Sequence, residues 1–355
     1  MKKVCISTYC EWSSYGSVLQ AIGLKHVLQE IGLESFLIRD MPAPVAQKEF
    51  RFRICANPRT LFSEIRNTRA RKKKGILYKN TVKFINQHVD IQYYNDFEVL
   101  NKNIPIANYY LAGSDQIWHP NLCKKVFFLD FLPSNIKRLS YAASMGVENI
   151  PQEKVADFQN LISKMDTISV RETEAKDIIG KYTDKPIYRH IDPTFLVDQT
   201  FWRQFSKEYP IKKPYILVYA IYWDAKFNSE LRKLHRKTGY DIVALCPGGW
   251  SKVWANKKIY DADPGQFLYL IDHAQAVISS SFHGVALAVN FNKKISVIVN
   301  PKAPSRLTTL LSVLGLKRVT ISEVMEFDSA QYNQINQKIE QEKQAGMRYL
   351  KEVLK

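Results

Sequence analysis

Short apolar segments alternate with amphipathic segments along most of this chain of 355 residues. Residues 2–8 and 35–40 have the composition of strands, and residues 17–32 between them carry apolar side chains near a 3.6-residue period that ends at a glycine. A strand, a helix and a second strand in this order form a parallel pair, because the helix returns the chain to the edge where the first strand began. The chain is therefore predicted to be an α/β protein whose parallel sheets are covered by helices.

This alternation occurs as two series in tandem, with no repeat between them at the level of sequence. The first series continues with strands predicted at residues 108–116 and 137–144, and with a strand running into a helix at residues 167–180. The second begins after residues 191–195 and has strands predicted at residues 214–221, 241–248, 274–281 and 295–301. We therefore predict two Rossmann-like domains that face each other across a cleft: residues 1–190, with a basic and mostly helical insertion at 41–105, and residues 191–325, followed by a helix within 326–355.

Composition indicates a soluble cytoplasmic protein. Hydrophobic residues make up 46% of the chain, enough to build packed cores, but no apolar run reaches the roughly 18 residues of a membrane span. The first residues, MKKVCISTYCEW, become polar too early for a signal peptide. The five cysteines are scattered and have no CxxC spacing, which is typical of a reducing compartment and argues against a disulfide framework or a zinc site.

The net charge of +17 is the unusual bulk property, and residues 66–75 hold six of the cations. Such a run is either a solvated surface segment or a contact with an anionic partner. No helix-turn-helix, zinc-finger or RRM signature supports nucleic acid as that partner. An anionic membrane surface, or a phosphate-rich or lipid-linked substrate, is the functional alternative that we favour. We therefore expect peripheral contact with the inner face of a membrane.

One histidine, His283, follows the strand predicted at residues 274–281 and precedes a short apolar helix. Ligands of open parallel sheets bind beyond the carboxyl ends of the strands, and the free N–H groups of a helix N-terminus attract anions. The next strand ends just before Lys302, which places this lysine at the same edge. The alternative is that His283 only caps its helix and Lys302 is solvated. The residues predict an anion pocket, to which three hydroxyl donors could contribute: Ser279, Ser280 and Ser281.

Arg171 is placed in the same way, directly after the strand of the segment 167–180. An arginine there could grip a carboxylate or a phosphate with two parallel hydrogen bonds, a geometry that lysine does not match. The alternative is an ion pair with Glu172 or Glu174 in the helix that follows.

Polar residues also follow the strand at residues 108–116. Asp115 and Gln116 are suited to hydrogen-bonding a hydroxylated ligand. Trp118, two residues further on, could stack on the face of a sugar or could simply be packed.

Six segments, taken together and in this order, resemble the polysaccharide pyruvyl transferase family. They cover most of the chain, from about residue 3 to about residue 320. They are YGSVLQA (15–21), AGSDQIWHP (112–120), SYAASMG (140–146), ISVRETEA (168–175), IDPTFL (191–196) and SSSFHGVALA (279–288). The combination of GSDQIW, SVRE and SFHG is specific, although each motif alone would be weak.

The resemblance implies a fold similar to GT-B glycosyltransferases, with the site between two Rossmann-like domains. It implies transfer of the enolpyruvyl-derived group of phosphoenolpyruvate to a sugar, with formation of a cyclic ketal and release of phosphate. The acceptor would be a saccharide of a surface polysaccharide precursor, linked to a polyprenyl diphosphate. No metal and no organic cofactor is implied.

The resemblance also implies roles for single residues. Arg171 matches the family's arginine that would hold the donor, and His283 matches the histidine that would protonate the methylene carbon or engage the phosphate. Lys302 matches a basic residue about twenty positions further on. Many members have an arginine two residues before the histidine, where this chain has Ser281, so one cation is missing. Arg306 is the predicted replacement; its alternative role is surface pairing.

The remaining site residues are predicted by their places in these motifs. Asp115 is expected to orient or deprotonate the acceptor hydroxyl. The donor side includes the serines 279–281 and Gly284. The acceptor side comprises Gly16, Ser17, Ser114, Gln116 and Trp118.

Two other functions stay open. A nucleotide-sugar glycosyltransferase on the same scaffold would use the helix N-terminus for a diphosphate and would need a pocket for the base. A non-catalytic member that binds sugar or phosphate would be one in which Ser281 marks a lost donor site.

Overall fold

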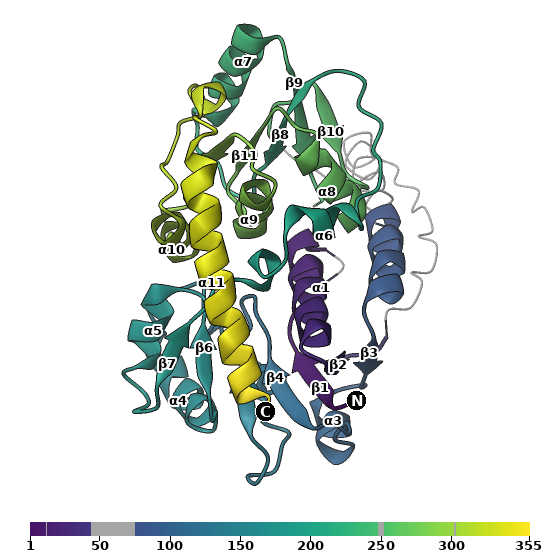
Figure 1. Cartoon of the computed structure of the whole chain (residues 1–355), viewed down its shortest axis with the longest axis vertical. Coiled ribbons are helices and arrows are strands. Elements are labelled where there is room, and N and C mark those ends of the chain that lie inside the picture. Colours follow the sequence, from purple (N-terminus) through teal and green to yellow (C-terminus); the bar gives the residue numbers. More distant parts are fainter. Residues whose placement is uncertain (12, 44–74, 248–251, 302) are drawn as a thin grey trace, which may run out of the picture.

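The computed structural model shows two parallel sheets joined by a long C-terminal helix (Figure 1). It describes residues 1–11, 13–43, 75–247, 252–301 and 303–355. Both main sheets have five strands, and in both the order is third, second, first, fourth and fifth along the chain. We call residues 1–189 the N-terminal half and residues 199–314 the C-terminal half.

The N-terminal sheet has the order β3-β2-β1-β4-β5, and all its strands are parallel. The strands are β1 (Lys3–Ser7), β2 (Glu34–Arg39), β3 (Ile91–Tyr93), β4 (Tyr109–Ala112) and β5 (Arg138–Ser140). The helical elements of this half are α1 (Tyr15–Glu30), a helix over residues 75–88, α3 (Phe97–Lys102), η1 (Lys125–Phe128), η2 (Gln152–Lys154), α4 (Val155–Ser163) and α5 (Thr173–Ile179).

The segment predicted as a helical insertion, residues 41–105, contributes a strand to the sheet itself. β3 pairs with β2 through three residues, from Leu37 opposite Ile91 to Arg39 opposite Tyr93. No residue of β3 is fully buried, so the segment carries no apolar run that would mark it as a strand in the sequence, and the prediction missed it. Of the basic cluster 66–75, residues 66–74 lie outside the described residues.

The C-terminal sheet repeats the order as β10-β9-β8-β11-β12, again all parallel. Its strands are β8 (Tyr215–Tyr219), β9 (Asp241–Leu245), β10 (Lys257–Ile259), β11 (Ala276–Ser279) and β12 (Ile295–Val297). The helices around it are α6 (Gln199–Arg203), α7 (Phe227–Thr238), α8 (Pro264–Asp272), α9 (Phe282–Asn290) and α10 (Ser305–Leu314).

A third sheet of two strands, β6 (Ile168–Val170) and β7 (Ile187–Arg189), continues the N-terminal sheet after a break. Ala142 has a φ of 49° just after β5, which interrupts the ladder. Serine hydroxyls replace two ladder bonds there: Ser169 Oγ accepts from Ala142 N at 2.9 Å, and Ser140 Oγ accepts from Ser169 N at 2.8 Å. The carboxyl end of β6 therefore lies at the same edge as that of β4.

Helix α11 (Gln331–Val353) runs past both halves of the molecule (Figure 1). Near its start, Tyr332 Oη donates to Lys293 O at 2.6 Å, in the C-terminal half. Near its end, Tyr349 Oη donates to Ser140 O at 3.0 Å, in the N-terminal half. Helix α11 thus contacts both halves and links them. The short helix η3 (Pro193–Phe195) lies on the connection between the halves, and η4 (Val324–Glu326) precedes α11.

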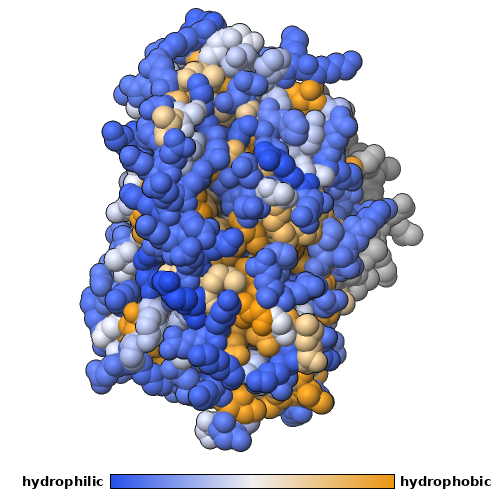
Figure 2. Space-filling view, viewed as in Figure 1, coloured by the Kyte–Doolittle hydropathy of each residue, from blue (hydrophilic) through white to orange (hydrophobic). Residues whose placement is uncertain are grey.

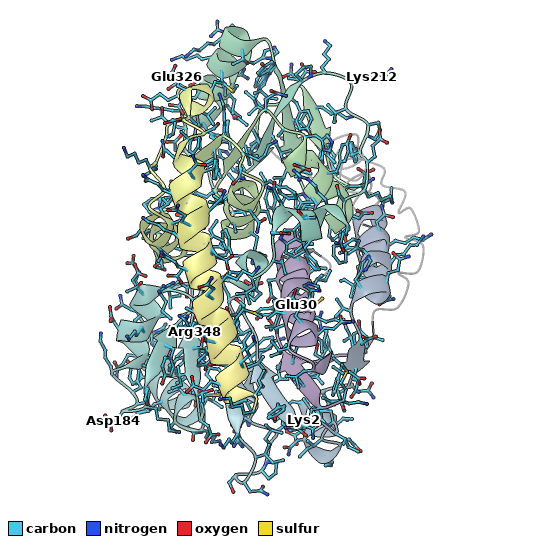
Figure 3. All side chains as sticks on the ribbon, viewed as in Figure 1. Lys2, Glu30, Asp184, Lys212, Glu326 and Arg348 are labelled. Carbon is cyan, nitrogen blue, oxygen red and sulfur yellow. The ribbon has the colours of Figure 1, made fainter. Side chains whose placement is uncertain are left out.

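The halves also share a hydrophobic core along α1. One cluster of buried residues includes members of both sheets, and Tyr15 of α1 stacks on Phe267 of α8 with ring centroids 4.6 Å apart. Charged side chains lie at both ends of the molecule, with Glu326 and Lys212 labelled at one end and Asp184 near the other (Figure 3). On the face seen in Figure 2 hydrophilic residues cover most of the surface. Within the described part of the chain, no helix combines the length and the apolar character that a membrane crossing requires.

Candidate active site

Three charged side chains from three segments meet where the two halves join. Arg171 follows β6, Asp192 lies on the connection between β7 and η3, and His283 stands in the first turn of α9. Arg171 Nη1 donates to Asp192 Oδ2 at 2.6 Å, and His283 Nε2 lies 3.5 Å from the same oxygen. Relative exposure is 4% for Arg171, 0% for Asp192 and 7% for His283. Arg171 and His283 therefore converge, as predicted, but they do so on a carboxylate inside the protein.

Arg171 keeps one donor unused in this cluster. Its Nε faces Glu172 Oε1 at 3.4 Å, and its guanidinium lies 3.9 Å from the ring centroid of Phe282. Nη2 is buried and has no hydrogen-bond partner among the described residues. Burial by itself would lower the pKa of Arg171, but Glu172, Asp192 and Asp115 together raise it. The side chain is thus a fixed cation with a free N–H edge, and it makes the ion pair with Glu172 that was its alternative role.

Both carboxylate oxygens of Asp192 accept two hydrogen bonds each. Oδ1 accepts from Thr194 N at 3.0 Å and from Thr194 Oγ1 at 2.8 Å. Oδ2 accepts from Ser114 Oγ at 3.1 Å as well as from Arg171. Burial would raise the pKa of Asp192, but His283 and Arg171 hold it well below its usual range. Asp192 therefore stays ionised at the junction of the two halves.

Arg306, in the first turn of α10, lies beside this cluster. It lines a cavity of about 10 Å³ together with Arg171, Asp192 and Phe282. Burial lowers the pKa of Arg306, as does the charge of Arg171, against the opposing effects of Glu172 and Asp115. Its Nε is buried without a partner among the described residues. The half-buried Arg306 is thus next to Arg171 and not in a surface ion pair.

Asp115 and Gln116 lie at the end of β4, at the same edge. Asp115 has a φ of 71°, a left-handed conformation that aspartate tolerates better than most residues. Its main-chain oxygen accepts from Ile117 N at 2.7 Å and from Ser144 N at 2.9 Å, and its Oδ1 accepts from Gln116 N at 2.9 Å. Both side chains are partly exposed. Asp115 is close enough to influence the pKa of Arg171 and of Arg306.

The N-terminus of α1 closes the cluster from the other side. A Cβ atom on Gly16 would lie 2.1 Å from His283 Nδ1, so the glycine is required for the imidazole to fit. Ser17 is turned away: its Oγ accepts from Glu11 N at 2.9 Å and donates to Ser14 O at 3.0 Å. Both were predicted on the acceptor side. The structure places Gly16 against His283 and makes Ser17 part of the turn that begins the helix.

The serines before His283 are directed mostly to the backbone. Ser279 Oγ donates to Tyr219 O at 2.7 Å and accepts from Ser281 N at 3.1 Å. Ser280 Oγ accepts from two N–H groups of the loop after β8, each at 2.9 Å. A Cβ on Gly284 would lie 2.4 Å from Ser279 Oγ, so this glycine allows close packing. The prediction that Ser279 and Ser280 bind the donor is corrected accordingly, because both hydroxyls are engaged in joining β11 to β8.

The prediction for Trp118 was wrong. Its side chain is fully buried, and its ring stacks on Phe128 with centroids 5.5 Å apart. Nε1 donates to Phe127 O at 3.1 Å. This ring belongs to the core and cannot stack on a sugar. Lys302 lies outside the described residues.

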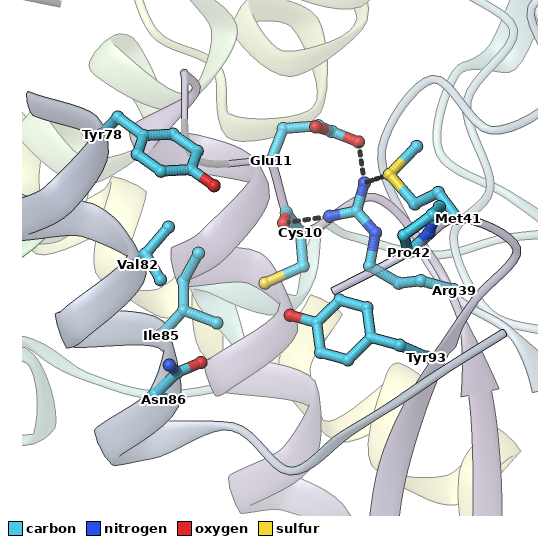
Figure 4. Close-up of a pocket in the computed structure, with 10 residues that line it drawn as sticks. All are labelled: Cys10, Glu11, Arg39, Met41, Pro42, Tyr78, Val82, Ile85, Asn86 and Tyr93. Atoms are coloured by element: carbon cyan, nitrogen blue, oxygen red, sulfur yellow. Dashed lines mark hydrogen bonds and ion pairs between the residues drawn. The ribbon is translucent and has the colours of Figure 1, made fainter. Parts of the chain in front are cut away.

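A second opening lies at the carboxyl ends of β1 and β2, beside the turn that leads into α1 (Figure 4). Its volume is about 160 Å³. Arg39 Nη1 donates to Cys10 O at 2.6 Å, and the same guanidinium pairs with Glu11. The rings of Tyr78 and Tyr93 are part of its wall. We call this opening the Arg39 pocket.

Asp192 was missed at the level of sequence, and Glu172 was considered there only as an ion-pair partner of Arg171. Glu172 Oε1 accepts from Ser144 Oγ, and Oε2 is buried without a partner among the described residues. Both carboxylates lie in the segments IDPTFL and ISVRETEA, so the available signal was a charged residue next to a predicted strand end. Across the described ranges, no group of three or more His, Cys, Asp or Glu side chains is arranged to hold a metal ion.

Comparison with known proteins supports the fold and gives a family match. The family model for polysaccharide pyruvyl transferase matches residues 15–300. No curated protein matches the chain by sequence.

Among solved structures, UDP-GlcNAc 2-epimerase from Neisseria meningitidis, bound to UDP-GlcNAc, is 11% identical with a TM-score of 0.53, over 98% of this chain and 94% of its own. A putative UDP-N-acetylglucosamine 2-epimerase from Listeria monocytogenes is 9% identical with a TM-score of 0.53, over 95% and 91%. The structure of MnaA from S. aureus with UDP is 13% identical with a TM-score of 0.50, over 94% and 90%. At these identities the likeness concerns the fold alone. It confirms the predicted class of two Rossmann-like domains in a GT-B arrangement.

Proposed function

This chain belongs to the polysaccharide pyruvyl transferase family, and from that premise we propose that it transfers the enolpyruvyl-derived group of phosphoenolpyruvate to a sugar as a cyclic ketal. One observation supports this most directly. Three buried nitrogen atoms, Arg171 Nη2, Arg306 Nε and His283 Nε2, have no hydrogen-bond partner among the described residues. Buried donors without partners are costly, so their convergence favours an anionic ligand that supplies the missing acceptors.

Phosphoenolpyruvate fits such a set of donors. Its phosphate and carboxylate together carry close to three negative charges near neutral pH. Arg171 and Arg306 would hold these groups through charge-assisted hydrogen bonds. Arg306 would then replace the arginine that many members carry where this chain has Ser281.

The reaction needs one proton delivered and two removed. Protonation of C3 of phosphoenolpyruvate leaves positive charge at C2, which one sugar hydroxyl attacks. A second hydroxyl then attacks C2 as the C–O bond to phosphate breaks, and the departing phosphate accepts the remaining proton. His283 would deliver the first proton, and Asp115, at the open edge of β4, would orient or deprotonate an acceptor hydroxyl.

We assign the saccharide acceptor to the N-terminal half. The Arg39 pocket lies at the carboxyl ends of β1 and β2, the edge at which open parallel sheets bind their ligands. Its wall combines tyrosine rings with polar groups, which suits a sugar ring. We further propose an acceptor linked to polyprenyl diphosphate, in a surface polysaccharide pathway such as capsule or exopolysaccharide assembly. The enzyme would act in the cytoplasm beside the inner face of the membrane, without a metal or organic cofactor.

A nucleotide-sugar glycosyltransferase is the second candidate, because solved structures with the same fold contain UDP or UDP-GlcNAc. A non-catalytic sugar- or phosphate-binding member is the third. Thermal stabilisation separates them: phosphoenolpyruvate should raise the Tm of the pyruvyl transferase, whereas UDP should raise that of the glycosyltransferase. Phosphate release from phosphoenolpyruvate, with a mass gain on one of a panel of lipid-linked saccharides, would establish turnover. Binding without turnover on any acceptor would favour the third candidate.

Arg306→Ala tests the arrangement of the donor site. Loss of one charge-assisted hydrogen bond, worth about 1.5–3 kcal/mol, should raise the KM for phosphoenolpyruvate by about 10- to 100-fold. Arg203→Ala is the matched control, because Arg203 pairs with Asp272 at 2.8 Å on the surface, away from the cluster. An unchanged donor KM in Arg306→Ala would reject the replacement of the missing arginine.

A further inference from the structure

Asp192 is a carboxylate of the cluster that faces side chains from both halves of the molecule. It lies on the connection between them and is fully buried. Arg171 and Ser114, which donate to its Oδ2, belong to the N-terminal half, and His283, 3.5 Å from that oxygen, belongs to the C-terminal half. A single oxygen atom is therefore the common point of three side chains that come from β6, β4 and α9.

We propose that Asp192 is a positioning residue for the transfer reaction, whose Oδ2 sets the donor-binding Arg171 and the imidazole of His283 at a fixed separation across the junction of the two halves. This inference rests on the function proposed above. Asp192 would not touch the substrate, because its Oδ2 already contacts three protein groups and no part of the side chain reaches the surface.

The two oxygens of Asp192 have different roles. Oδ1 stabilises the local turn, and Oδ2 supports the site. Oδ1 accepts only from the backbone and hydroxyl of Thr194, at the start of η3. Oδ2 has no contact with that turn and faces Arg171, Ser114 and His283. This division allows each oxygen to be tested by its own substitution.

The negative charge at Oδ2 has a further consequence. Arg171 and His283 come from opposite halves, and the carboxylate between them accepts from the guanidinium of the one and faces the imidazole of the other. Arg171 uses one N–H on Asp192 and keeps Nη2 free. Asp192 can therefore hold both groups in place while Arg171 retains a donor for the substrate.

The test compares Asp192→Asn with Thr194→Val. Asparagine keeps the size of the side chain but removes its charge, whereas valine removes only the hydroxyl that donates to Oδ1. Asp198→Asn is a second control, since Asp198 caps α6 by accepting from Phe201 N at 2.9 Å and has no contact with the cluster. Each variant is measured for kcat and for the KM for phosphoenolpyruvate, per molecule of folded protein.

We expect Asp192→Asn to lower kcat by about 10²- to 10⁴-fold and to raise the KM for phosphoenolpyruvate. Both controls should keep both constants near those of the unchanged protein. On a His283→Gln background, Asp192→Asn should lower kcat by less than about tenfold further, because residues that act through one another are not additive. Equal losses on both backgrounds would overturn the positioning role, as would constants unaltered by Asp192→Asn.

A second measurement covers a variant that is too unstable for kinetics and a protein that does not turn over phosphoenolpyruvate. Urea unfolding of the two single variants and of the double variant gives the coupling between Asp192 and His283 without any substrate. Non-additive losses of stability support the contact that the inference requires, and additive losses overturn it. Absence of phosphate release from the unchanged protein, with coupling present, would reject the proposed function and leave the contact standing.

Discussion

Two buried histidines of the described chain, His283 and His190, lie in regions of opposite character. His283 and His190 have nearly the same exposure, 7% and 6%. His283 faces the ionised carboxylate of Asp192 across the junction of the halves. His190 lies among aromatic rings. Its ring centroid is 4.4 Å from that of Tyr349, in α11, and 5.7 Å from that of Tyr141.

The two histidines differ in the residues that surround them and not in how deeply they are buried. Burial, with a smaller effect from Arg189, lowers the pKa of His190 to about 4, so its imidazole is neutral at physiological pH. Its Nδ1 is hydrogen-bonded to Ser169 Oγ at 2.8 Å, whereas His283 Nε2 has no hydrogen-bond partner in the described part of the chain. A histidine whose ring is satisfied by the fold is structural, and one that retains an unused nitrogen beside fixed charges is suited to proton transfer.

Replacement of each histidine in turn should give the largest difference in kcat between the two regions. His283→Gln should lower kcat by about 10²- to 10⁴-fold, because it removes the proposed proton donor. His190→Gln should leave turnover of the folded protein close to that of the unchanged enzyme. Both should cost about 1–3 kcal/mol in the free energy of unfolding, since both rings are packed. Phosphate release and urea unfolding measure the two effects.

The expected cost in stability follows from the packing of His283. The structure places His283 inside α9, against Gly16 and next to Phe282. Full turnover in His283→Gln would remove this residue from the mechanism and make the two histidines equivalent.

A smaller effect is expected when the space around His283 is changed. In Gly16→Ala, the new Cβ would lie 2.1 Å from His283 Nδ1, so the ring or the helix has to move. A displacement of about 1 Å at a reacting group can lower turnover by up to about 100-fold, and overpacking costs about 1–3 kcal/mol of stability. Steady-state kinetics and thermal unfolding report the two losses.

Gly32→Ala is the matched control for Gly16→Ala. Gly32 has a φ of 83°, and a Cβ atom on it would have no neighbour within 4 Å, so alanine there strains the backbone but displaces nothing. It should cost about 1 kcal/mol of stability, with turnover unchanged. Similar kinetic losses in both variants would show that α1 acts through the stability of the fold and not through its contact with His283.

The smallest effect is expected in the aromatic region around His190, where the free energy of unfolding should depend on pH. The folded protein holds His190 with a pKa of about 4, below the value of about 6.5 in an unfolded chain, so the unfolded state binds more protons between these values. Stability should therefore fall by about 2–3 kcal/mol as the pH drops from 6.5 to 4. His190→Gln should reduce this fall, and urea unfolding at pH 7, 5.5 and 4.5 measures it. The same pH dependence in both proteins would exclude His190 as its source.

Much of the fold was predictable from local pattern. The predicted strand at residues 2–8 corresponds to β1 and the helix at 17–32 to α1, because each carries several apolar residues in the spacing of its element. The strands β7 and β10 were missed, as β3 was, because most of their residues are exposed or only partly buried and they carry no apolar run. Their formation depends on the sheet and not on their own residues.

The candidate site was likewise predicted in part from local sequence and decided in part by tertiary packing. The order of strands and helices along the chain was enough to place Arg171 and His283 at the carboxyl ends of parallel strands. Tertiary packing was needed to bring Asp192 between them and to enclose Trp118 among the aromatic residues of η1. It also directed Ser279 and Ser280 to the backbone of β8 and its following loop. The partner of a polar side chain is set by which distant segments the fold brings within hydrogen-bonding distance, and a local pattern carries no information about them.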